Sequence, residues 1–121
     1  MAILSVEAKS AIAEIHPGLI ATADASGKPN VSAKGTFRLL DDEHVLFADV
    51  NSPRTIANLL ENPQVSTIVL DPATRRGCRI WGRAEVLDSG ELFDGVNQGL
   101  AARNLQAKHV VLISVDDFAV F

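Results

Sequence analysis

Helical periodicity marks three segments of the chain. Apolar residues recur at intervals of three and four over residues 4–15, where Ser5 can cap the helix. A second helix is predicted over residues 52–62, because Pro53 suits the first helical position and one apolar face follows it. A third and weaker helix is predicted over residues 91–102, since two glycines lower its helix propensity.

The other apolar positions are typical of short β-strands separated by turns. Gly27 supplies the positive φ of a tight turn, so the segments on either side of it form a hairpin. The second hairpin strand, residues 29–40, is expected to adjoin residues 44–50. Residues 64–71 form a nearly continuous apolar run, which predicts burial on both faces. The six predicted strands are residues 18–25, 29–40, 44–50, 64–71, 78–87 and 109–115.

Strands that arrive as antiparallel neighbours, without alternating helices, indicate a mainly β protein. A chain of 121 residues has room for one domain, and no repeat or low-complexity linker interrupts it. We therefore predict a single domain over residues 1–121, built as a six-stranded antiparallel β-barrel with about three helices.

Charge and composition bear on compartment and partners. With 11 basic and 15 acidic residues the net charge is −4, opposite to that of a nucleic-acid-binding protein. Cys78 is the one cysteine, and the first residues lack the features of a secretory signal, so we expect a cytoplasmic protein. No apolar stretch approaches the ~18 residues of a membrane span. The mean hydropathy of +0.17 suggests a buried subunit interface, although small aliphatic-rich monomers also exist.

Motifs of metal binding and covalent catalysis are missing from the sequence. His16, His44 and His109 are scattered, and neither they nor Cys78 form a close-spaced pair of metal ligands. The nucleophile motif GxSxG, the phosphate loop GxxxxGK and the dinucleotide motif GxGxxG do not occur. The acidic residues 41–43 are typical of a solvated turn. We expect no metal site and no catalytic side chain.

The start of the second helix has the composition of a phosphate site. A helix N-terminus presents unpaired backbone amides and the positive end of the helix dipole. Ser52, Arg54 and Thr55 add two hydroxyls and a guanidinium at the same place. A capping role for Ser52, with Arg54 in solvent, would explain the same residues without a ligand.

A neighbouring strand strengthens the phosphate hypothesis. If residues 29–40 pair with residues 44–50, then Ser32, Ala33 and Lys34 lie beside the start of the helix. The alternative is that Lys34 lies on an exposed face of the barrel.

One face of the strand at residues 78–87 combines Arg79, Trp81 and Arg83. These residue types are enriched at subunit interfaces, although a solvated sheet surface would also carry them. Cys78 is expected to pack as a small hydrophobic residue, because no neighbour in the sequence would lower its pKa.

Three stretches of the chain, taken in order, resemble a known family. LIATADASGKPNVSAKG, VLFADVNSPRTIANLLENPQVSTIVLD and GCRIWGRAEVL are similar to the pyridoxamine 5'-phosphate oxidase-like split β-barrel flavoproteins, a family that includes small FMN-binding proteins. The resemblance covers roughly residues 19–87. It implies a six-stranded split barrel that forms a homodimer and binds FMN in a groove between the subunits.

The family's cofactor positions carry over residue by residue. Arg54 and Thr55 occupy the positions of a basic residue and a polar neighbour on the FMN phosphate, and Ser52 stands at the same helix start. The other matching positions line the ribityl chain and the ring, or follow in the helix: Ser32, Ala33, Lys34, Asp49, Val50 and Asn58. A phosphate dianion suits a helix N-terminus with an arginine, and a flat ring suits strand backbone and aliphatic walls.

The sequence also departs from the family. Nothing after Ala107 resembles the substrate-binding segment of true pyridoxamine phosphate oxidases, so vitamin B6 oxidation is not expected. The arginine-led phosphate motif of those oxidases is missing from residues 29–40, which offer Lys34 and Arg38, and so are the ring-shielding aromatics of some small relatives.

We expect a homodimeric FMN protein that acts as an oxidoreductase or in electron transfer with a small-molecule or protein redox partner. Lys34 is expected to tune the ring, because a nearby cation stabilises the anionic reduced flavin. Three alternatives remain: a non-catalytic flavin carrier or sensor, the same barrel with haem or a deazaflavin, and a structural dimer with an empty groove. No histidine is clearly placed on the proposed groove, which argues against haem.

Overall fold

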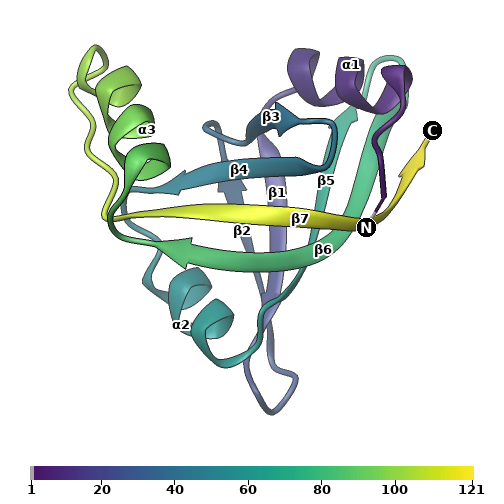
Figure 1. Ribbon diagram of the computed structural model, residues 1–121. Helices are drawn as coiled ribbons and strands as arrows, with labels where there is room; N and C mark the ends of the chain where they lie inside the picture. Colours follow the sequence, from purple (N-terminus) through teal and green to yellow (C-terminus); the bar gives the residue numbers. More distant parts are fainter. Residues whose placement is uncertain (1) are drawn as a thin grey trace.

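The computed structural model of the protein describes residues 2–121, which form three helices and seven strands (Figure 1). The elements in chain order are α1 (Val6–Glu14), β1 (Gly18–Ala23), β2 (Pro29–Lys34), β3 (Arg38–Asp41), β4 (His44–Asp49), α2 (Pro53–Glu61), β5 (Gln64–Asp71), β6 (Arg76–Leu87), α3 (Glu91–Ala101) and β7 (His109–Val120). The prediction of a mainly β fold with three helices is confirmed.

All seven strands belong to one antiparallel sheet, in the order β2-β1-β5-β6-β7-β4-β3. Only residues 35–37 separate β2 from β3, so the two edge strands of the curled sheet meet at this connection. Figure 1 shows α1 above the sheet, α2 below it and α3 beside the left end of β4 and β7. The result is a barrel that is split between β2 and β3.

The seventh strand arises because residues 29–40, expected to form one strand, are divided at a bend. Lys34 ends β2 and Arg38 begins β3; β2 pairs with β1, whereas β3 pairs with β4. The expected pairing of residues 29–40 with β4 therefore holds only for the β3 part. At the bend, the Thr36 hydroxyl accepts a hydrogen bond from Ala48 N at 3.0 Å and lies 3.3 Å from Ala48 O, while Phe37 is buried in the barrel.

The three helices form where the sequence predicts them. Ser5 caps α1, because its side-chain oxygen accepts a hydrogen bond from Ala8 N at 3.1 Å. Ser52 occupies the N-cap position of α2 but makes no side-chain capping bond there. No helix among residues 2–121 is long and apolar enough to cross a membrane.

Two strand predictions are corrected by the structure. In β5 buried and more exposed residues alternate, so burial on both faces is wrong; Leu70 is 48% exposed. The last strand, expected to end at Val115, continues to Val120 because its outer half pairs with β6 beyond a bulge at Trp81 and Gly82.

Two hydrophobic clusters hold the fold together. The larger one fills the barrel beneath α1, and the smaller one joins α3 to the outer side of β4 and β7 through Leu46, Val96, Leu100 and Val110. Cys78 belongs to the larger cluster, as expected of a small hydrophobic residue, and burial raises the pKa of its thiol to about 11.

Gly82 is required by the close approach of two strands at the bulge. A Cβ at this position would overlap the carbonyl oxygen of Ser114 and lie 2.8 Å from Ile113 Cγ2. We expect Gly82→Ala to lower the free energy of unfolding by about 2 kcal/mol, measured by urea denaturation. The matched control is Gly99→Ala in α3, where the added Cβ meets no atom within 4 Å. This control should gain up to about 1 kcal/mol from helix propensity, and equal stability of the two variants would contradict the assignment.

Candidate functional site

Polar side chains of β2 meet the start of α2 across the split in the barrel. Lys34 Nζ donates a hydrogen bond of 2.6 Å to Ser52 Oγ, and the hydroxyls of Ser32 and Thr55 lie 3.0 Å apart. Asn30 Nδ2 lies 3.4 Å from the same Thr55 oxygen. Alternate residues of β2 thus face α2, and the sequence-based placement of Lys34 and Ser32 beside this helix agrees with the structure.

Asp49, at the end of β4, is the buried centre of this cluster. The residue is 2% exposed, and its carboxylate accepts hydrogen bonds on Oδ1 from Ser52 N at 2.7 Å and from Ser52 Oγ at 2.6 Å. The second oxygen, Oδ2, lies 2.8 Å from His109 Nδ1. An ionised carboxylate can only accept, so Nδ1 carries the proton of this bond. The Ser52 hydroxyl therefore donates to Asp49 and accepts from Lys34, and it does not cap α2.

The charges of the cluster are balanced. Burial opposes the negative charge of Asp49, but the hydrogen bonds from Ser52 and His109 outweigh it and hold the pKa of the carboxyl below its usual value. Burial lowers the pKa of Lys34, while the nearby charge of Asp49 opposes that shift. A hydrogen-bonded chain of Lys34, Ser52, Asp49 and His109 thus crosses the site.

His109 is the site residue that sequence reasoning missed. It lies 60 residues from Asp49 in the chain and begins β7, which pairs with β4 so that these two residues are direct neighbours. No local sequence motif indicates this contact. A sequence analysis would have found it only by predicting that β4 pairs with β7. Its position contradicts the expectation that no histidine lies at the groove.

Two hollows flank α2. One of about 180 Å³ lies between the β1–β2 turn and the helix, and its polar lining residues are Arg54, Asn58, Asn30, Lys28 and Asp24. The other, of about 290 Å³, is lined by Asp49, His109 and the apolar side of the helix start. Arg54 is exposed, and Asn58 donates a hydrogen bond of 3.1 Å to Thr22. The helix start therefore offers a guanidinium and its first backbone amides to an anion.

Not every predicted cofactor residue joins the cluster. Ala33 lies on the opposite face of β2, so only its backbone runs past the site. Thr55 is 1% exposed, and its hydroxyl is hydrogen-bonded to that of Ser32 in β2. It therefore connects the strand to the helix. Val50 is half-buried in the bend between β4 and α2.

The three residues predicted for a subunit interface share the outer face of β6. Arg79, Trp81 and Arg83 are exposed, and the Arg79 guanidinium lies 5.9 Å from the centre of the Trp81 ring. Strand pairing sets Arg79 beside Ile68 of β5 and Ile68 beside Leu19 of β1. This outer face therefore combines apolar side chains with arginines.

A sequence model of the family described as pyridoxamine 5'-phosphate oxidase matches residues 4–120. The chain belongs to this family. A further relative is the uncharacterized protein MJ0282 of Methanocaldococcus jannaschii, which is 33% identical over 108 residues; the match covers 81% of this chain and 68% of that protein.

Three solved structures have the same fold as this chain. HupZ of Group A Streptococcus is 25% identical, with a TM-score of 0.91 over 98% of this chain and 94% of HupZ. An FMN-binding protein of Syntrophomonas wolfei is 20% identical, with a TM-score of 0.83 over 94% of this chain and 83% of that one. HutZ, the haem storage protein of Vibrio cholerae, is 25% identical, with a TM-score of 0.71 over 98% of this chain and 95% of HutZ.

We expect Asp49→Asn to lower the free energy of unfolding by about 2 kcal/mol at pH 7, because the amide returns only part of the hydrogen bonding. The folded pKa of Asp49 lies below its unfolded value, so the ionised carboxylate contributes stability above about pH 4 that is lost as the pH falls through the folded pKa. Urea denaturation at pH 7 and pH 3 should therefore show the deficit of the variant shrinking in acid. Asp88→Asn, at an exposed position, is the control; a deficit that does not change with pH would contradict this role.

Proposed function

We propose that this protein binds FMN along β2 and the start of α2 and uses it in redox chemistry. One observation carries the proposal. Lys34 is hydrogen-bonded to Ser52, which is hydrogen-bonded to Asp49, and Arg54 is exposed beside them at the N-terminus of α2. Membership of the pyridoxamine 5'-phosphate oxidase family supports a flavin as the ligand.

The residues present fit the two ends of FMN. The first amides of α2 and the Arg54 guanidinium suit a phosphate, and the hollow between the β1–β2 turn and α2 adds the Lys28 ammonium. Lys34 would hold a positive charge beside the ring, where Ser52 and Asp49 fix its position. When bound, FMN supplies hydride or single-electron transfer, and the redox partner is a small molecule or a protein.

We further propose that the protein acts as a homodimer through the outer face of β6. Trp81 is 39% exposed and Leu70 48% exposed on the outer side of the sheet, next to Arg79. Aromatic residues and arginine are the types that carry subunit interfaces. Burial of this face would also account for the high mean hydropathy of the chain.

Haem is the second candidate ligand, and one observation favours it. His109 donates through Nδ1 to the buried Asp49, which leaves Nε2 as the free nitrogen of the ring. A histidine oriented in this way by a carboxylate is typical of a metal ligand. The likeness to the haem storage protein HutZ, at 25% identity, gives this candidate further support.

The absorption spectrum of the purified protein after addition of FMN and gel filtration tests the cofactor. We expect flavin bands to remain with the protein, and Arg54→Ala to weaken FMN binding at least about tenfold, because a charge-assisted hydrogen bond to the phosphate is lost. Arg75→Ala, in an exposed turn, is the matched control. Unchanged affinity of Arg54→Ala would refute the phosphate site. Failure to retain FMN, together with a haem spectrum that is lost in His109→Ala, would favour the second candidate.

Sedimentation velocity tests the dimer. We expect Trp81→Glu to convert a wild-type dimer largely to monomer, because a carboxylate would be buried without a partner in the interface. Val6→Glu is the control, since Val6 is 75% exposed on α1 away from this face. A wild-type monomer, or a Trp81→Glu dimer as stable as the wild type, would exclude this interface.

A further inference from the structure

A further cavity, separate from the two hollows beside α2, lies on the other side of the β2–β3 bend, between β3, β4 and α3. Its volume is about 370 Å³, within the range of sites for small molecules. Buried side chains of Phe37, Leu46, Val96 and Leu100 form its apolar floor. None of the residues assigned above to FMN lines this cavity, although it begins at Gly35, directly after Lys34.

Two glycines on one face of α3 keep the cavity open. Gly95 and Gly99 are one helical turn apart, and a Cβ added at either position would meet no atom within 4 Å. Packing of the fold therefore does not require glycine at these positions, and each glycine costs helix stability. Larger side chains at these positions would occupy part of the cavity. The two glycines therefore keep its volume free, although packing of the core does not require them.

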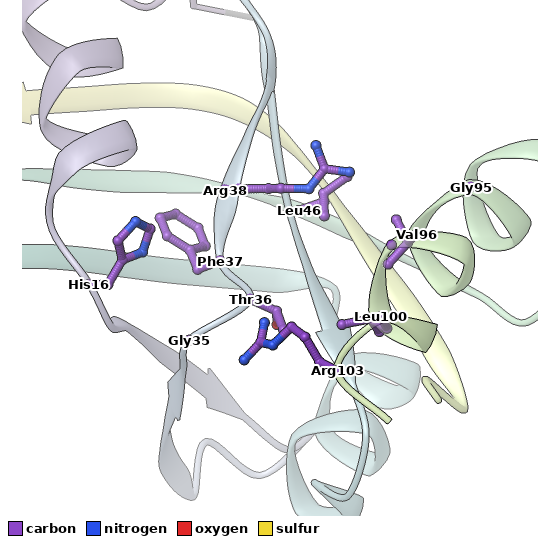
Figure 2. A pocket seen from close by; sticks show the side chains of 11 residues that line it. His16, Gly35, Thr36, Phe37, Arg38, Leu46, Gly95, Val96, Leu100 and Arg103 are labelled. Atoms are coloured by element: carbon purple, nitrogen blue, oxygen red, sulfur yellow. The ribbon is translucent and has the colours of Figure 1, made fainter. Parts of the chain in front are cut away.

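All titratable groups that line the cavity are basic. Arg38 and Arg103 lie on opposite walls: Figure 2 shows Arg38 extending from β3 toward α3, and Arg103 extending from beyond the end of α3 toward Thr36. Within residues 2–121 neither guanidinium has an ion-pair partner, and no carboxylate lines the cavity. The third titratable group is His16. In a protein of net charge −4, two unpaired guanidiniums at one cavity favour an anion there.

We propose that this cavity binds a small organic carboxylate whose apolar body rests on the floor formed by Phe37, Leu46, Val96 and Leu100. Arg103 holds the carboxylate head, since arginine pairs with carboxylates through two parallel hydrogen bonds, and Arg38 adds positive charge on the opposite wall. The open face of α3 at Gly95 and Gly99 admits the body of the ligand. This site is independent of the FMN proposal because the two share no residue.

Phenylacetate is the probe, and amide chemical shifts of the ¹⁵N-labelled protein are the measurement. We expect phenylacetate to shift the amides of Gly35, Gly95 and Gly99, and to bind at least about tenfold more tightly than the neutral phenylacetamide or than acetate. The first comparison removes the charge and the second removes the apolar body. Equal binding of all three compounds, or shifts confined to other parts of the chain, would overturn the proposal.

Two variants with matched controls test the walls. Gly99→Leu should fill the cavity and reduce phenylacetate binding at least about tenfold, whereas Gln98→Leu adds the same side chain at an exposed position outside the cavity and should not. Arg103→Met keeps an apolar stem without the charge and should give a similar loss, with Arg75→Met as the control. Thermal melts establish that each variant is folded. Folded Gly99→Leu and Arg103→Met proteins that bind phenylacetate like the wild type would refute the site.

Discussion

The buried carboxylate of Asp49 is the group around which the site is organised. An ionised carboxylate removed from water is strongly unfavourable unless hydrogen bonds and opposite charge compensate it. Ser52 and His109 supply those hydrogen bonds, and Lys34 supplies the charge. Meeting this one requirement fixes the end of β4, the start of α2 and the start of β7 relative to one another. The backbone takes part as well, because Lys108 N donates to Asp49 O at 2.8 Å.

The same cluster explains why the barrel can remain split. Within residues 2–121, no ladder of backbone hydrogen bonds joins β2 to β4, and the strand that pairs with β2 is β1. Side chains bridge the gap in its place: Lys34 reaches Ser52, Ser32 reaches Thr55, and Thr36 binds Ala48. Side-chain bridges leave room between them that a ladder would close. The opening in the sheet and the proposed ligand site beside α2 are therefore consequences of one arrangement.

Sequence reasoning predicted the elements whose signals are local. The cap at Ser5, the proline at Pro53 and the turn at Gly27 placed α1, α2 and the first hairpin. It could not predict the bend after Lys34, because that bend depends on the Thr36 hydroxyl binding the backbone of Ala48 in β4 and on Phe37 entering the core. Lys34 was placed beside α2 correctly, although the expected pairing with β4 holds only for β3 and not for β2, which carries Lys34.

Residues whose role depends on pairing between distant strands could not be assigned from the sequence, because their contacts have no local signal. His109 joins Asp49 only because β7 crosses the sheet to lie beside β4, and nothing near either residue in the chain announces it. The capping role considered for Ser52 failed because its hydroxyl oxygen accepts a hydrogen bond from the Lys34 ammonium instead of a helix amide, while its proton is donated to the Asp49 carboxylate. The net charge of the chain also gives little information about the candidate site. It argues against a polyanionic partner, but it sums acidic residues spread over the whole chain, while Arg54, Arg38 and Arg103 line the hollows. A small anion responds to the local field of those arginines, because charges in solvent beyond about 10 Å are screened by salt.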